Sequence, residues 1–122
     1  MTSRKILLID DDAELCEELA DILREYGYKV KIAPDAFKGE TLLVSGRFDL
    51  AVLDYKMPGL TGVEILKRTS NSTVKTVILL VSGRPFMEKL LETENLSGRV
   101  SAVLYKPFAP EDLLAKIKKL AG

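Results

Sequence analysis

Three acidic residues follow the first apolar run of the 122-residue chain and offer oxygen ligands to a cation. Residues 6–9 are apolar, and Asp10, Asp11 and Asp12 come directly after them. Adjacent carboxylates repel one another unless a cation or the positive end of a helix holds them. Asp12 can cap the next helix, which leaves Asp10 and Asp11 to be explained. Hard carboxylate oxygens suit Mg²⁺, although the triplet alone fits a solvated loop better than a metal site.

A single acid, Asp54, ends the apolar run of residues 50–53. The turn residues 55–59 follow it. A carboxylate at the end of an apolar strand fits a functional residue and, equally well, an Asp that hydrogen-bonds its own turn.

A hydroxyl and an ammonium group follow two further apolar runs. Ser82 and Gly83 come after residues 74–81, where the hydroxyl can donate to an oxyanion and the glycine lets a ligand approach the backbone, although Ser-Gly also simply marks a turn. Lys106 follows residues 100–104, and a lone lysine is usually a solvated surface charge. The carboxyl ends of the strands in an open parallel sheet meet at one edge. Ser82 and Lys106 would therefore join Asp10, Asp11 and Asp54 there.

The elements that must position these groups are five short apolar runs alternating with helical patterns. The runs are residues 6–9, 30–33, 50–53, 74–81 and 100–104. Several are almost unbroken by polar residues, which is typical of strands that helices cover on both faces. The order predicts an α/β fold, an open five-stranded parallel sheet with five helices, as a single domain over residues 1–122.

Several helix boundaries can be predicted from capping residues. The first helix has an apolar stripe at helical spacing, formed by Leu15, Leu19, Ile22, Leu23 and Tyr26. Gly27 is suited to end it. Thr61 and Glu64 have the spacing of a capping box and predict a helix start near Thr61. Pro110 fits the first turn of the last helix.

Composition and charge narrow the class of protein. Hydrophobic residues make up 47% of the chain, and Lys plus Arg number 18 against 18 Asp plus Glu, so no field of one sign favours nucleic acid or a membrane as partner. The basic residues near the C-terminus, Lys116, Lys118 and Lys119, fit the negative end of a helix better than a nucleic-acid surface. The single Cys16 cannot form an internal disulfide and fits a buried small residue. With no apolar segment typical of a signal peptide or a membrane span, we expect a cytoplasmic location.

The complete set of residues resembles the receiver domains of two-component response regulators, the CheY-like family, over essentially the full length. The matching motifs are Asp10-Asp11, residues 54–59 with Gly62, Ser82, and Lys106-Pro107-Phe108. This resemblance implies a doubly wound, flavodoxin-like fold. It also implies a signalling domain rather than an enzyme, one that takes part in its own phosphorylation and dephosphorylation and shifts conformation to alter partner binding.

The resemblance implies a role for each matched residue. Asp54 would be the phosphoacceptor, taking its phosphoryl group from a sensor histidine kinase or a phosphotransfer protein. Mg²⁺, or Mn²⁺ in its place, would be held by Asp10, Asp11, Asp54 and the backbone carbonyl of Lys56. Ser82 and Lys106 would contact the phosphoryl oxygens. In the family the bond matching Lys106–Pro107 is commonly cis.

Partners beyond the phosphodonor are only partly implied. A downstream protein or an effector domain would receive the output, the first helix and nearby loops would form the docking face, and dimerisation through the last helices stays open. One rival is a receiver-like binding module that is not phosphorylated. Others are an aspartate-nucleophile phosphatase, which would have an acid where Lys56 stands, and a flavin protein, which would have a phosphate-binding loop where Asp10 and Asp11 stand.

The sequence departs from the family pattern near the last strand. Many receivers carry an aromatic residue three positions before the lysine, and here that residue is Val103. Tyr105 should face the same side of the strand and either substitutes for the aromatic or packs against the last helix. The cations Lys56 and Arg84 either shield the acyl phosphate or lie in solvent.

Overall fold

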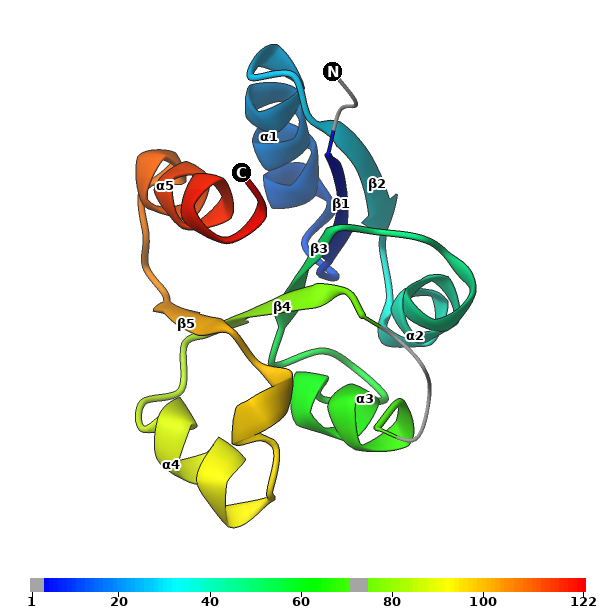
Figure 1. Cartoon of the computed structure of the whole chain (residues 1–122), viewed down its shortest axis with the longest axis vertical. Helices are drawn as coiled ribbons and strands as arrows, with labels where there is room; N and C mark the ends of the chain where they lie inside the picture. The colour runs from blue at the N-terminus through cyan, green and yellow to red at the C-terminus, as the bar shows by residue number, and fades with distance from the viewer. Residues whose placement is uncertain (1–3, 71–74) are drawn as a thin grey trace.

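The five short apolar segments form the strands of one parallel sheet. The computed structural model describes residues 4–70 and 75–122. In these two stretches the strands are β1 (Lys5–Ile9), β2 (Lys29–Ala33), β3 (Leu50–Asp54), β4 (Val77–Ser82) and β5 (Ala102–Tyr105). Their order across the sheet is β2-β1-β3-β4-β5, so the central strand β3 lies between β1 and β4 (Figure 1).

Five α-helices alternate with these strands in the described residues. They are α1 (Ala13–Glu25), α2 (Ala36–Ser45), α3 (Gly62–Arg68), α4 (Met87–Thr93) and α5 (Pro110–Ala121), with a short 3₁₀ helix, η1 (Ser97–Arg99), before β5. Helices α1 and α5 cover one face of the sheet, and α2, α3 and α4 cover the other (Figure 1). The predicted five-stranded, doubly wound α/β fold is therefore confirmed. No helix within residues 4–70 and 75–122 is long and apolar enough to cross a membrane.

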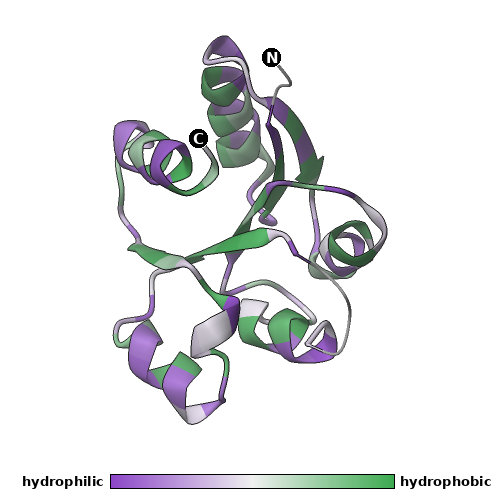
Figure 2. Ribbon diagram, viewed as in Figure 1, coloured by the Kyte–Doolittle hydropathy of each residue, from purple (hydrophilic) through white to green (hydrophobic). Residues whose placement is uncertain are grey.

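The core consists of two layers, one on each side of the sheet. Alternate residues of β1 point to opposite layers, with Ile6 and Leu8 toward α1 and α5, and Leu7 and Ile9 toward α2 and α3. Because both faces are covered, apolar residues fill β1 and β3 almost without interruption. Apolar colouring accordingly runs along β4 and much of the helices' inner faces, whereas the edge strand β2 also shows hydrophilic segments (Figure 2).

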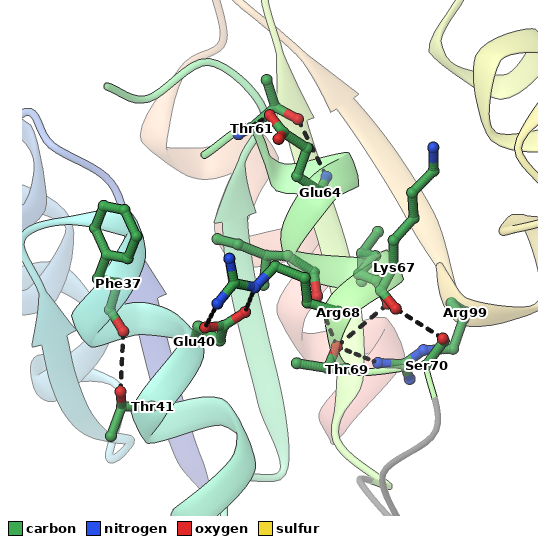
Figure 3. Close-up of polar contacts among 12 residues, drawn as sticks. Phe37, Glu40, Thr41, Thr61, Glu64, Lys67, Arg68, Thr69, Ser70 and Arg99 are labelled. Atoms are coloured by element: carbon green, nitrogen blue, oxygen red, sulfur yellow. Dashed lines mark hydrogen bonds and ion pairs between the residues drawn. The ribbon is translucent and has the colours of Figure 1, made fainter. Parts of the chain in front are cut away.

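The capping predictions are confirmed. The hydroxyl of Thr61 accepts the backbone N–H of Glu64 at 3.1 Å, and the Glu64 carboxylate accepts the N–H of Thr61 at 3.0 Å (Figure 3). Pro110 is the first residue of α5. Gly27 follows α1 with a φ of 91°, a conformation that glycine adopts without steric cost.

The largest departures from the sequence prediction are in the fourth and fifth strands and at Tyr26. The fourth strand begins at Val77 rather than residue 74, and Val74 lies outside the described residues. The fifth strand is shifted to Ala102–Tyr105, because η1 and the exposed Ser101 precede it. Tyr26 was wrongly placed on the apolar stripe. It is the C-cap of α1 and is 56% exposed, with the Lys118 ammonium 4.5 Å from the centre of its ring.

Ion pairs fix α3 between its two neighbouring helices. The Arg68 guanidinium lies 2.6 Å from the Glu40 carboxylate of α2 (Figure 3), and the Lys67 ammonium lies 2.6 Å from the carboxylate of Glu94, the C-cap of α4. The Arg99 guanidinium of η1 also donates to the hydroxyl of Thr69. These contacts restrain the helix that follows the end of β3.

Candidate acidic site at the sheet edge

Asp54 lies at the end of the central strand β3 and is 5% exposed. The hydrogen bonding to β4 extends one residue past the end of β3, because the Tyr55 N–H donates to the Val81 carbonyl at 2.8 Å. Gly62 begins α3 directly against this point. A Cβ at that position would lie 2.9 Å from the Asp54 carbonyl oxygen, so only glycine lets the helix start so close. The local backbone thus holds the carboxylate at a fixed position.

Asp10 and Asp11 lie beside Asp54, as predicted. One carboxylate oxygen from each of the three residues lies within 4.8 Å of the others. Asp12 caps α1 by accepting the N–H of Leu15 at 3.1 Å, also as predicted. The Asp12 N–H in turn donates to the Asp10 carboxylate at 3.0 Å, which orients that side chain. Asp11 is exposed at the rim.

Lys106 extends from the end of β5 into the same cluster. Its ammonium lies 3.2 Å from one Asp54 oxygen and 3.7 Å from an Asp10 oxygen. The Lys106 backbone N–H donates to the Ser82 carbonyl at 2.8 Å, so the end of β5 is tied to the end of β4. The Lys106–Pro107 peptide bond is cis, as the resemblance implied.

The charges of the cluster are not balanced. Burial, and then the charge of Asp10, raise the pKa of Asp54 to about 6, although Lys106 opposes this. Burial also raises the pKa of Asp10, against the hydrogen bond from Asp12 and the charge of Lys106. For Lys106, burial acts to lower the pKa, but the charges of Asp54 and Asp10 outweigh it and the pKa is raised. Three carboxylates face one ammonium, and a divalent cation would relieve the excess negative charge.

Ser82 lies at the end of the neighbouring strand β4, but its hydroxyl already makes two hydrogen bonds within the following loop. The residue is fully buried. Its Oγ donates to the Arg84 carbonyl at 3.0 Å and accepts the Arg84 N–H at 2.9 Å. The predicted position at the sheet edge is therefore confirmed, and the hydroxyl closes a local turn.

The two cations predicted to overlook the site differ in their contacts. The Arg84 guanidinium donates to the Tyr55 hydroxyl at 3.0 Å and lies 5.8 Å from the centre of the Tyr55 ring. It is thus held beside the residue that follows Asp54. The side chain of Lys56 is exposed. The Arg84–Tyr55 contact could not be predicted from the sequence, because it depends on how two separate loops fold against each other.

Tyr105 faces the same layer as Val103, as predicted, but contacts a different helix from the one expected. Both side chains pack against the layer that contains α4. The alternative of packing against α5 is wrong, because the Tyr105 hydroxyl bonds to Met87 and Glu88 of α4. Sequence reasoning missed Glu88, which looks like any exposed acid on a short helix.

Cys16 is buried beneath the acids, as predicted for a small apolar residue. Its thiol donates to the Asp10 carbonyl, with sulfur and oxygen 3.6 Å apart. Burial, and then the charges of Asp10 and Asp12, raise the pKa of the thiol to about 12. The thiol therefore stays protonated and has a packing role.

The sequence matches a family model and curated relatives over nearly all its length. Residues 6–118 match the model described as the response regulator receiver domain. The response regulator MprA of Mycobacterium sp. (strain KMS) is 33% identical over 116 residues, which cover 95% of this chain and 50% of the relative. MprA of Mycobacterium bovis (strain BCG / Pasteur 1173P2) is 33% identical over 118 residues, covering 97% and 50%. The chain thus spans about half the length of these curated relatives.

Solved structures show the same architecture. A receiver domain protein (CheY-like) from Methanospirillum hungatei JF-1 has a TM-score of 0.85 at 31% identity, covering 97% of this chain and 93% of that one. CheY4 of Vibrio cholerae has a TM-score of 0.84 at 29% identity, covering 98% and 99%. The response regulator TrrA of Thermotoga maritima, solved in complex with Mg²⁺ and BeF, has a TM-score of 0.80 at 27% identity, covering 96% and 98%.

Proposed function

The chain belongs to the response regulator receiver domain family of two-component signalling, and from this premise we propose that Asp54 accepts a phosphoryl group in a Mg²⁺-dependent reaction. One observation carries the proposal. The buried carboxylate of Asp54 lies beside the ammonium of Lys106 and close to the carboxylates of Asp10 and Asp11. The phosphodonor is a sensor histidine kinase or a phosphotransfer protein. We propose that residues 1–122 form one receiver domain that acts in the cytoplasm.

Asp10, Asp11, Asp54 and the backbone carbonyl of Lys56 would hold the metal ion. Their oxygens are the hard ligands that Mg²⁺ prefers, and Mn²⁺ can replace it. The raised pKa values of Asp10 and Asp54 support this assignment, because burial leaves both carboxylates poorly solvated, and the charge of Asp10 adds to this effect at Asp54. A bound cation would supply the stabilisation that water no longer gives. When bound, the cation neutralises charge on the phosphoryl oxygens. The relative TrrA was solved with Mg²⁺ and BeF.

Asp54 supplies the nucleophile. One of its carboxylate oxygens attacks phosphorus, the P–N bond of the donor phosphohistidine breaks, and its electron pair stays on the imidazole, which takes a proton from solvent. The product is an acyl phosphate on Asp54. Lys106, 3.2 Å from the carboxylate, stabilises the charge of the phosphoryl oxygens. Ser82 can donate its hydroxyl proton to one of those oxygens once it leaves the Arg84 carbonyl.

A groove next to the site fits a helix of the phosphodonor. It has a volume of about 610 Å³ and lies between α1 and the loop from β5 to α5. Apolar side chains and charged ones line it together, namely Leu15, Leu19, Pro107, Phe108 and Pro110 with Asp12, Glu18 and Lys106. An amphipathic helix that lays its apolar face in this groove would bring its phosphohistidine to the edge of the acid cluster.

The output passes to a downstream protein or an effector domain. We propose protein contacts for this role, with no direct nucleic-acid contact and no membrane contact from these residues, and with a homodimer as an alternative partner. The balanced charge, 18 basic and 18 acidic residues, supports the choice of protein partners.

The test is incubation with acetyl phosphate and Mg²⁺, followed by intact-mass measurement of the wild type and of Asp54→Asn. We expect a mass increase of one phosphoryl group on the wild type and none on the variant. An adduct that persists on the variant would place the site elsewhere. No adduct on the wild type, with this donor or with a histidine kinase, would favour a binding module that is not phosphorylated.

A further inference from the structure

The hydroxyl of Tyr105 joins the last strand to the start of α4. It accepts the backbone N–H of Met87 at 3.0 Å and donates to the carboxylate of Glu88. Met87 is the first residue of α4, so its N–H is one of those that the helix itself cannot satisfy. Tyr105, which is the last residue of β5, therefore caps the N-terminus of helix α4.

Helix α4 has no side-chain cap of its own. Helices α1, α2 and α3 each begin after an Asp or Thr whose side chain accepts a backbone N–H. The corresponding residue of α4 is Phe86, which makes no such hydrogen bond. The Tyr105 hydroxyl supplies the acceptor that Phe86 lacks.

The backbone before α4 is held in an uncommon conformation. Phe86 has a φ of 61° and a ψ of 35°, in the left-handed region that residues with a Cβ rarely adopt. Phe86 is 78% exposed, so packing of its side chain does little to hold this conformation. Such conformations persist where neighbouring contacts fix them. Here the neighbours are the buried side chain of Met87 and the hydrogen bond from Met87 to Tyr105.

Ser82 holds the other end of the same loop. A hydroxyl has one proton to donate, and Ser82 gives it to the Arg84 carbonyl. Donation to a phosphoryl oxygen therefore requires that this bond break. Only two residues separate Arg84 from Met87 in the sequence. Movement at Ser82 would therefore act on a short segment whose far end Tyr105 restrains.

We propose that Tyr105 is a positioning residue whose hydroxyl holds the start of α4 in the unphosphorylated conformation and so opposes phosphoryl binding. The inference rests on the proposed function of Asp54. Burial, and then the hydrogen bond to Glu88, raise the pKa of Tyr105, so the hydroxyl keeps its proton at neutral pH. Release of the Met87 N–H is then a cost of activation, and removal of the hydroxyl lowers that cost.

The test uses Tyr105→Phe, which keeps the ring and removes only the hydroxyl. Binding of beryllium fluoride with Mg²⁺, a mimic of the phosphoryl group, is measured by calorimetry on the full chain. We expect its Kd to fall roughly fivefold, the size of one lost helix cap. Tyr28→Phe is the matched control, because the Tyr28 hydroxyl also bonds to backbone, at the Gly122 carbonyl 3.2 Å away. Its Kd should match the wild type.

Amide hydrogen exchange measures directly how firmly the start of α4 is held. Without beryllium fluoride, exchange at the start of α4 should become faster in Tyr105→Phe and should stay unchanged in Tyr28→Phe. An unchanged or higher Kd in a Tyr105→Phe protein that binds the mimic would overturn this inference alone. A wild type that binds no mimic and accepts no phosphoryl group would overturn both the inference and the proposed function.

Discussion

The acid cluster and the loop between β4 and α4 lie at the same edge of the sheet but are held in different ways. Asp54 extends from a strand whose five residues are all buried, between two paired neighbours. Helix α4 has only seven residues, with Met87 and Leu91 buried, and packs near β5, whose residues are all partly exposed. A site built on a buried strand can keep its geometry through a reaction, whereas an element with few buried contacts can move.

Substitution of a buried leucine in each region should sharpen this contrast. Leu53→Ala removes a fully buried side chain from β3 and should lower the free energy of unfolding by about 3 kcal/mol. Leu91→Ala on α4 should cost about 2 kcal/mol or less, because the short helix can close around the smaller residue. Urea denaturation measures both values. Equal losses would mean that α4 is packed as firmly as the central strand.

Removal of the Lys106 charge should have opposite effects on the phosphorylation rate of Asp54 and on the affinity of the acid cluster for Mg²⁺. Lys106→Met leaves three carboxylates without their ammonium partner, so phosphorylation of Asp54 by acetyl phosphate should slow about a hundredfold. Mg²⁺ should bind more tightly, because it no longer competes with the ammonium. Intact-mass time courses and calorimetry measure the two effects. Lys119→Met is a control for loss of an exposed lysine, and slower phosphorylation together with weaker Mg²⁺ binding would contradict this account.

The acid cluster and the region around α4 were not equally predictable from the sequence. Asp54, Lys106 and the acid pair were found because a parallel sheet brings strand ends to one edge, a rule that depends only on element order. The link from Tyr105 to α4 was not found, because it depends on how a half-buried edge strand meets a short helix. The sequence predicted the face on which Tyr105 lies but not the helix that it contacts, since α4 begins at Met87, after Phe86, without a side-chain cap of its own.

The pH dependence of stability should reveal the strain among the acids. Without metal, the pKa of Asp54 is raised from its usual 3.8 to about 6 by burial. The folded state then binds more protons than the unfolded state between these values, so stability falls as pH rises from about 4 to 6 and stays lower above it. Since each pKa unit corresponds to about 1.4 kcal/mol, the loss over the whole range should be about 3 kcal/mol, of which about 1.3 kcal/mol falls between pH 5 and pH 7. Urea denaturation in chelator at pH 5 and pH 7 measures it, and Asp54→Asn should flatten the difference. A wild type more stable at pH 7 than at pH 5 would refute the assignment.

The smallest expected effect concerns the contact between Arg84 and Tyr55, which joins the loop of β4 to the residue after Asp54. The guanidinium is held beside the site by a 3.0 Å bond to the Tyr55 hydroxyl. If it shields the acyl phosphate from water, Arg84→Ala should speed dephosphorylation about threefold, an effect below 1 kcal/mol. Tyr55→Phe, which frees the guanidinium but keeps the ring, should speed dephosphorylation less.

Lys56→Ala tests the second cation, whose side chain is exposed and should matter least. The decay of the phosphoryl adduct by intact mass measures all three rates. Unchanged decay in Arg84→Ala and Lys56→Ala would show that neither cation shields the site, and that the loop of β4 reaches Asp54 through Ser82 alone.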